Sequence, residues 1–165
     1  MNSMVEIRSA QPEDIPECAT LAVELIGPRR GQPFIQAALD RRQLLVASDN
    51  GSVVGFLAYR TDWFNCTFVS LVVVAPDRRR KGIARGLYRA LEAESPSPRV
   101  FSSTEETNAA SIQMHSALGF TASGHIDNLP QGCRELLFYK RLAGGIGGQR
   151  DRFSVFGDNG EASHV

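Results

Sequence analysis

The sequence lacks an apolar run long enough to cross a membrane, and its N-terminus lacks the apolar core of a signal peptide. Cysteine is scarce: Cys18, Cys66 and Cys133 are odd in number and widely spaced, so neither a disulfide framework nor a zinc site is indicated. Each is most simply a small apolar side chain. We therefore expect a reducing, cytoplasmic setting, with no membrane partner and no metal.

An excess of charge of either sign is missing as well. The 18 Lys and Arg residues balance the 18 Asp and Glu residues, so the formal net charge is zero. Proteins that bind nucleic acid are usually basic overall, and we expect no nucleic-acid partner. An apolar content of 42% in 165 residues is typical of one globular domain with a buried core.

Positive charge is concentrated in one place, residues 78–81, which read RRRK. The apolar run of residues 71–74 precedes it and predicts a buried strand, which Pro76 ends. After Gly82, apolar residues recur at helical spacing. A basic turn thus joins a strand to the start of a helix, where free N–H groups and the helix dipole favour anions. The arrangement predicts a site for a phosphate or pyrophosphate.

Two common phosphate loops do not fit this stretch. The Walker pattern places its Lys after the second Gly, whereas Lys81 precedes Gly82, and the three spaced glycines of the dinucleotide pattern are missing. The stretch instead resembles the acetyl-CoA loop of the GCN5-related N-acetyltransferase (GNAT) family. That loop reads Arg or Gln, two residues, Gly, one residue, then Gly or Ala. The matching residues here are Arg79, Arg80, Lys81, Gly82, Ile83 and Ala84.

The resemblance implies acetyl-CoA as cosubstrate, with its pyrophosphate on the backbone amides of this loop. It also implies that backbone N–H groups of Val72, Val73 and Val74 bind the reacting oxygen, where two parallel strands splay apart. The residues alone leave a simpler alternative open, a solvated basic turn whose glycine serves only the geometry of the turn.

The resemblance further implies an α/β (α+β) fold, with a mixed, mostly antiparallel central sheet, helices on both faces and a β-α-β core that binds acetyl-CoA. The hydrophobic pattern agrees with that order of elements. It predicts strands over residues 5–8, 44–47, 53–59, 67–74, 99–104, 120–126 and 135–141, and helices over 12–25, 34–42, 83–91 and 108–118. We expect residues 1–143 to form the domain and the glycine-rich residues 144–165 to form a flexible tail.

A second stretch, Asn108 followed by a predicted helix and Gly119-Phe120, resembles another motif of the family. The resemblance implies that Asn108 contacts the pantetheine or phosphates of CoA, although it is equally suited to cap the helix. Seven residues on, the family usually has a Tyr that protonates the departing thiolate, and this chain has His115. Either the imidazolium, or a water held by it, is the acid, or His115 is a core histidine with one hydrogen bond.

Together the two stretches indicate an N-acetyltransferase that moves the acetyl group directly to a primary amine of a small molecule or to an exposed amino group. The general base stays open, with four acids as candidates: Glu105, Glu106, Asp62 and Asp127. Each is more commonly a solvated surface acid. The loop residues expected near the acceptor are Arg29, Arg30, Trp63, Phe64, Asp127 and Asn128.

Two other interpretations remain open. Because His115 replaces the usual Tyr, the chain is alternatively a non-catalytic acyl-CoA-binding sensor or interaction module. The RRRK run alternatively belongs to a nucleotide-binding or nucleic-acid-binding domain. Homodimers are common among such folds, but the sequence itself does not show one.

Overall fold

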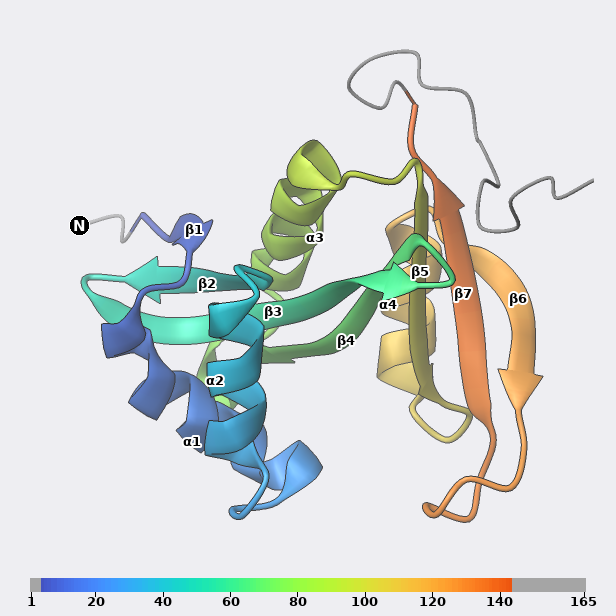
Figure 1. The fold of residues 1–165 in the computed structure, drawn as a ribbon, viewed down its shortest axis with the longest axis horizontal. Helices are drawn as coiled ribbons and strands as arrows, with labels where there is room; N and C mark the ends of the chain where they lie inside the picture. Colours follow the sequence, from blue (N-terminus) through green and yellow to red (C-terminus); the bar gives the residue numbers. More distant parts are fainter. Residues whose placement is uncertain (1–3, 144–165) are drawn as a thin grey trace, which may run out of the picture.

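Seven strands form one sheet, in the order β1-β2-β3-β4-β5-β7-β6, in the computed structural model, which describes residues 4–143 (Figure 1). The strands are β1 (Glu6–Ser9), β2 (Leu44–Asp49), β3 (Ser52–Trp63), β4 (Cys66–Val74), β5 (Arg99–Glu105), β6 (Thr121–Ile126) and β7 (Glu135–Arg141). Every neighbouring pair is antiparallel except β4 and β5, which are parallel. The expected tail, residues 144–165, lies outside the described residues.

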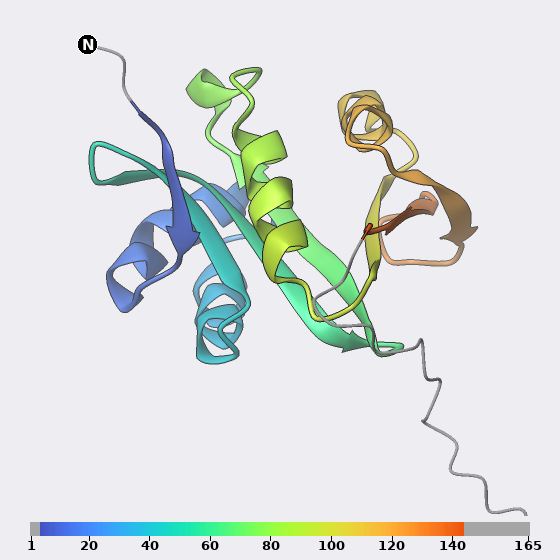
Figure 2. The same ribbon diagram turned by 90° about the horizontal axis from the view of Figure 1, so that it is seen from above.

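Helices cover both faces of this sheet. They are α1 (Ile15–Ile26), α2 (Gly31–Asp40), α3 (Ile83–Glu94) and α4 (Ala109–Ala117), with short 3-10 turns at Pro12–Asp14 and Pro76–Arg78. Helices α1 and α2 lie on one face of β2, β3 and β4, and α3 lies on the other, while α4 lies behind β5 (Figures 1 and 2). In residues 4–143 no helix is both long and apolar enough to span a membrane.

The alternation of side chains along the strands fills a separate core on each face. On the side of α3 and α4, Leu87, Tyr88 and Leu91 pack with Val100 and Phe138. On the side of α1 and α2, Cys18 and Ile35 pack with Val46, Phe56 and Ala58. The mixed sheet with helices on both faces is the fold class that the sequence predicted.

Helix α2 differs from its predicted span, because it begins at Gly31 and not at Phe34. A Cβ at Gly31 would lie 3.0 Å from the carbonyl oxygen of Ala19, so only glycine allows α2 to pack this closely on α1. Its buried residues are Gly31, Ile35 and Ala38, while Phe34 is half-buried. Ile35 and Ala38 are therefore the apolar side chains by which α2 packs on the sheet.

Two hairpins of the same kind flank β3. Asn50 (φ 51°) and Gly51 (φ 86°) form the tight turn between β2 and β3. Phe64 (φ 49°) and Asn65 (φ 57°) form a second one between β3 and β4, although it contains no glycine. This turn lets β3 continue to Trp63 and brings the Trp63 ring to within 5.0 Å of Phe101 on β5, centroid to centroid.

Candidate active site

The parallel strands β4 and β5 stay together over only two rungs, Thr67↔Val100 and Phe68↔Phe101. Beyond them β4 continues along β3 as far as Val74, and β5 continues along β7 as far as Glu105. We call the gap between the two diverging strands the fork. It is the splayed arrangement that the family resemblance implied, and it opens toward the C-terminal ends of both strands.

A bulge in β4 marks the point where the strands part. Tyr59 of β3 pairs with Val69 and Ala58 pairs with Leu71, so Ser70 is the extra residue. A bulge bends its strand and increases its local twist. The Ser70 hydroxyl oxygen is buried and has no hydrogen-bond partner within residues 4–143. Ser70 was not among the residues predicted from the sequence, although a serine inside an apolar strand was a visible signal.

The amides of β4 beyond the bulge alternate in direction. The Ala75 N–H donates to Val54 O of the β3 side at 2.9 Å. Because N–H direction alternates along a strand, the Val73 amide faces β3 as well, and the amides of Val72 and Val74 face the fork. The Arg79 side chain agrees with this, since its Nε donates to Val74 O at 3.2 Å. Of the three predicted donors, the ladder leaves Val72 and Val74 available.

The basic loop, residues 75–82, leads from the end of β4 to helix α3. Gly82 is the N-cap of α3 in the left-handed region, at φ 78°, and Arg80 is also left-handed, at φ 62°. A Cβ at Gly82 would meet no heavy atom within 4 Å. The first N–H groups of α3 follow at once, and such groups lack partners inside a helix. The loop therefore offers open backbone donors and exposed cations to an anion.

Arg78 holds this loop to the β2–β3 hairpin. Its guanidinium makes a short ion pair with Asp49 at the end of β2, and it also contacts Asp77 at 3.4 Å. The carboxylate of Asp49 is almost fully buried. It accepts a second hydrogen bond, 3.0 Å long, from the side-chain Nδ2 of Asn50. These carboxylates raise the pKa of Arg78 above its ordinary value. Asp49 was not among the residues predicted from the sequence, because nothing local connects it to Arg78, which lies 29 residues further along the chain.

Asn108 is the N-cap of α4. Its Oδ1 accepts a hydrogen bond from the Ser111 N–H at 3.0 Å, which is the capping role that the sequence left open. The contact with CoA, the other predicted role, is compatible with this cap and stays a prediction.

His115 of α4 lies in the core, 1% exposed, and both ring nitrogens have partners. Nδ1 lies 2.7 Å from the Ser111 carbonyl oxygen, which can only accept, so Nδ1 carries the proton. Nε2 lies 2.8 Å from the Ser102 hydroxyl. The ring stacks on Phe138, with centroids 4.4 Å apart. Burial lowers the pKa of His115 below its ordinary value, so the neutral ring is favoured near neutral pH.

Tyr88 of α3 extends this arrangement into a chain. Its hydroxyl lies 3.1 Å from the Ser102 hydroxyl. With neutral His115 the bonds run in one direction, because Tyr88 donates to Ser102 and Ser102 donates to Nε2. Burial raises the pKa of Tyr88 to about 12, so this phenol stays protonated. These hydrogen bonds, from Tyr88 through Ser102 to His115, link α3, β5 and α4 directly behind the fork.

The predicted candidates for the general base are spread over several places. Asp62 pairs with Arg60 at 2.7 Å, and this bond lowers the pKa of Asp62 to about 2. Asp127 pairs with Arg134 at 3.0 Å in the β6–β7 connection, and Glu106 accepts from the Arg134 backbone N–H at 3.1 Å. Glu105 ends β5 beside the fork. Of the four, Glu105 is the acid that the sheet itself holds next to the fork.

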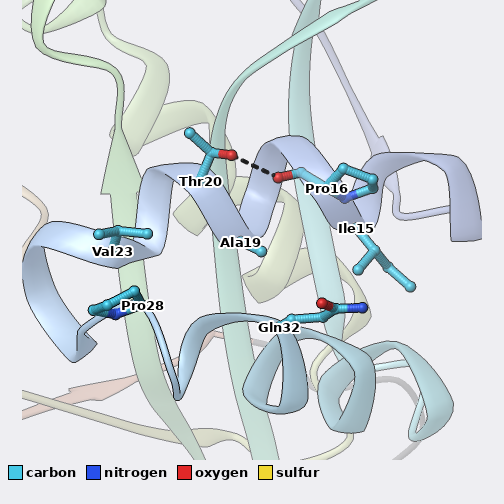
Figure 3. A pocket seen from close by; sticks show the side chains of 7 residues that line it. All are labelled: Ile15, Pro16, Ala19, Thr20, Val23, Pro28 and Gln32. Carbon is cyan, nitrogen blue, oxygen red and sulfur yellow. Dashed lines mark hydrogen bonds between the residues drawn. The ribbon is translucent and has the colours of Figure 1, made fainter.

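A hollow of about 290 Å³ lies elsewhere, between α1 and α2 (Figure 3). Its lining residues are Ile15, Pro16, Ala19, Thr20, Val23, Pro28 and Gln32. None of them belongs to β4, β5 or the basic loop. Arg29 and Arg30 are exposed next to it, in the connection between the two helices. The hollow is therefore separate from the fork.

Comparison with known proteins agrees with this geometry. The model of the acetyltransferase (GNAT) family matches residues 4–120. The chain belongs to this family. A GNAT-family acetyltransferase of Bacillus cereus, known from its crystal structure, is 32% identical, with a TM-score of 0.79 over 85% of this chain and 99% of that one. The Salmonella typhimurium protein yncA, solved with its cofactor acetyl-CoA, has the same fold, with a TM-score of 0.73 and 24% identity over 90% of this chain and 99% of that one.

Curated relatives match a shorter part of this GNAT protein. The L-methionine sulfoximine/L-methionine sulfone acetyltransferase of Pseudomonas aeruginosa is 38% identical over 97 residues, which are 53% of this chain and 56% of that protein. The Salmonella typhimurium enzyme of the same name is 35% identical over 91 residues, 50% of this chain and 53% of its own. The chain thus spans about half the length of the curated relatives it matches.

Replacing Gly82 by Val tests the basic loop. A Val at φ 78° is strained, but no protein atom stands within 4 Å of the new Cβ, so we expect the fold to survive while the side chain occupies the approach to the loop amides. We expect acetyl-CoA affinity, measured by calorimetry, to fall at least about tenfold, which needs only about 1.4 kcal/mol. Gly132→Val is the control for the strain, since Gly132 has the same φ of 78° and equally open space in the β6–β7 connection. Equal affinities of the two variants would remove the loop from the site.

Replacing Asp49 by Asn tests whether Arg78 holds the loop in place. The KM for acetyl-CoA should rise by roughly tenfold, because a buried ion pair loses one partner and the loop is released. The KM for S-acetylpantetheine, which lacks the pyrophosphate, should not change. Glu92→Gln, which breaks the ion pair between α3 and Lys140, serves as control. A rise of the same size for both thioesters would mean that Asp49 supports the fold and not the loop.

Proposed function

We propose that the chain is an N-acetyltransferase that transfers the acetyl group of acetyl-CoA directly to a primary amine. The main support for this proposal is the fork, where the amides of Val72 and Val74 face away from β3, a few residues before the open amides that follow Gly82. A thioester between the strands and a pyrophosphate on the basic loop would use both sets of donors at once. We further propose that the enzyme acts in the cytoplasm, in keeping with the free thiols of Cys18 and Cys133.

In the proposed reaction the neutral amine attacks the thioester carbon. A nitrogen–carbon bond forms, and the carbonyl electron pair moves to oxygen, where a fork amide stabilises the oxyanion. The tetrahedral intermediate then collapses, the carbon–sulfur bond breaks, and the electron pair leaves on the CoA sulfur. The amine proton passes to a base and the thiolate takes up a proton. Glu105 is the candidate base that lies closest to the fork along the sheet, directly or through water.

His115 is our candidate for the acid that protonates the thiolate, and its geometry limits how it acts. The neutral ring has its one proton on Nδ1, where the Ser111 carbonyl holds it. A proton would have to leave from Nε2 of the imidazolium, or through the Ser102 hydroxyl that bridges to Tyr88. The alternative that the sequence left open, a core histidine, predicts instead that His115 only orients the Ser102 hydroxyl.

Turnover of acetyl-CoA with a panel of primary amines, followed by thiol release, tests the proposed function. The panel should include L-methionine sulfone, one of the two amino acids named for the curated relatives. It should also include an unrelated protein with a free N-terminal amino group. Thiol release that depends on one of the amines is the expected result. Tight acetyl-CoA binding by calorimetry without turnover of any amine would support the non-catalytic binding module instead.

Replacing His115 by Ala distinguishes the two roles. If His115 is the acid, kcat should fall about 10²-fold, acetyl-CoA affinity should not change, and Tyr at this position should restore part of the rate. Wild-type kcat should decline as pH rises through the lowered pKa of His115, below about 6.5. An Ala variant with the wild-type kcat at every pH would leave His115 with a structural role alone.

The same variant has a stability signature. Folding lowers the pKa of His115, so below about pH 6.5 the unfolded chain takes up a proton that the folded chain resists. The contribution of His115 is therefore complete above that pH and is lost as pH falls. Urea unfolding of the wild type should show this decline as pH falls below about 6.5, and the Ala variant should lack it.

A further inference from the structure

Four aromatic rings, which we call the aromatic cluster, lie together on one face of the sheet: Trp63, Phe68, Phe101 and Tyr139. Trp63 stacks on Phe68, with centroids 4.9 Å apart and an interplanar angle of 23°, and lies 5.0 Å from Phe101. Phe101 in turn lies 5.1 Å from Tyr139. All four residues are only half-buried. The cluster therefore presents apolar ring surface to the outside of the molecule.

The aromatic cluster stands at the closed end of the fork. Phe68 and Phe101 are partners in the last rung that joins β4 to β5, and Tyr139 is the partner of Phe101 on β7. Val100 and Ser102 face the core under α3 and α4, so Phe101 lies on the opposite face. Helices α1 and α2 cover that face over β2 to β4, and within residues 4–143 no helix covers it over β5 and β7 (Figures 1 and 2). A ligand can thus reach the fork across these rings.

The same face carries two acids at the open end of the fork. Along the β5–β7 ladder, Phe101↔Tyr139 is followed by Ser103↔Leu137 and then by Glu105↔Glu135. Like charges directly opposite each other destabilise a ladder. The ion pairs within residues 4–143 include neither of these carboxylates, although Glu135 accepts a hydrogen bond from the Gln131 side chain at 3.2 Å. The two acids lie about 13 Å along the strand from the cluster, and their negative charge attracts a cation toward this end of the face.

We propose that this face binds the acceptor, and that the acceptor is an arylalkylamine, a primary amine joined by a short alkyl chain to a flat aromatic group. The inference rests on the proposed function and names the substrate class of the same site. The aromatic group stacks on the cluster, and the ammonium is drawn toward Glu105 and Glu135. The nitrogen then lies alongside the fork, where it must lose a proton before it attacks the thioester.

Two features of this face disfavour an amino acid as acceptor. The carboxylate beside its amine would approach Glu105 and Glu135 and be repelled. The cations of the ladder, Arg99 and Arg141, lie at its other end, beyond the cluster, and Arg99 donates to the Tyr139 hydroxyl at 3.3 Å. The acceptor therefore differs from the amino acids named for the curated relatives, whose similarity covers about half of this chain.

Fluorescence of Trp63 tests the inference without relying on turnover, because Trp63 is the one tryptophan of the chain. The full chain is titrated with 2-phenylethylamine, and the emission of Trp63 should change saturably. The same concentrations of n-butylamine, which has the amine but no ring, and of L-methionine sulfone should cause no saturable change. The series is measured with and without acetyl-CoA.

Two variants separate the parts of the site. Phe101→Leu keeps an apolar side chain but removes a ring, and should raise the dissociation constant of 2-phenylethylamine about three- to tenfold. Phe34→Leu, a half-buried ring on α2, is its control. Glu105→Gln should raise the same constant about two- to fivefold, with a smaller effect at high salt. Glu24→Gln, an exposed acid on α1, is its control.

The outcomes of this test and of the proposed function are distinguishable. Saturable binding of 2-phenylethylamine without any acetyl transfer would reject the proposed reaction and keep the site. Three results would overturn the inference. The first is the absence of a saturable change in Trp63 emission, and the second is an equal effect of the control variants. The third is turnover of n-butylamine or L-methionine sulfone at least as fast as that of 2-phenylethylamine. The acetyl transfer itself would stand in the last of these cases.

Discussion

The early end of the pairing between β4 and β5 is the constraint on which the candidate site depends. Two rungs hold the strands together, and the extra residue Ser70 then turns β4 away. A sheet that stayed paired to Val74 would use the amides of Val72 and Val74 in its ladder and leave no space between the strands. The separation is stable because β3 and β7 pair with the diverging strands on their outer sides, and because Tyr88, Val100 and Phe138 pack behind them.

The basic loop depends on the fork for its position and on the β2–β3 hairpin for its shape. The bend of β4 decides where the loop starts, and the ion pair between Arg78 and the buried Asp49 fixes its first turn. Gly82 then changes the chain direction and starts α3. In the proposed function the amides of the loop and those of β4 bind one ligand, although they belong to different elements. Such convergence needs rigid supports on both sides of the loop.

The sequence predicted what is local and missed what the fold brings together. The strand, the RRRK run and Gly82 follow one another in the chain, so the family was visible from pattern alone, as was the cap at Asn108, while the anion site stays a prediction. Ser70 shows its bulge only through the register of a neighbouring strand. Asp49 meets Arg78 through tertiary contact, and the aromatic cluster joins β3, β4, β5 and β7. Hydrophobic periodicity carries no record of which strands become neighbours.

His115 shows why a family position does not by itself transfer a role. Tyrosine has one polar atom, at its tip, whereas imidazole has two, and in this chain both are bonded inside the molecule. The Ser111 carbonyl fixes the tautomer, and Ser102 and Tyr88 complete a chain whose hydrogen bonds all run toward Nε2. A charged imidazole would reverse the Ser102 bond and bring a buried charge against Phe138. The Ser102 hydroxyl must therefore turn its proton away from Nε2 before His115 can take up or release a proton there. In this series of hydrogen bonds, the part that has to move is the Ser102 hydroxyl and not the imidazole ring.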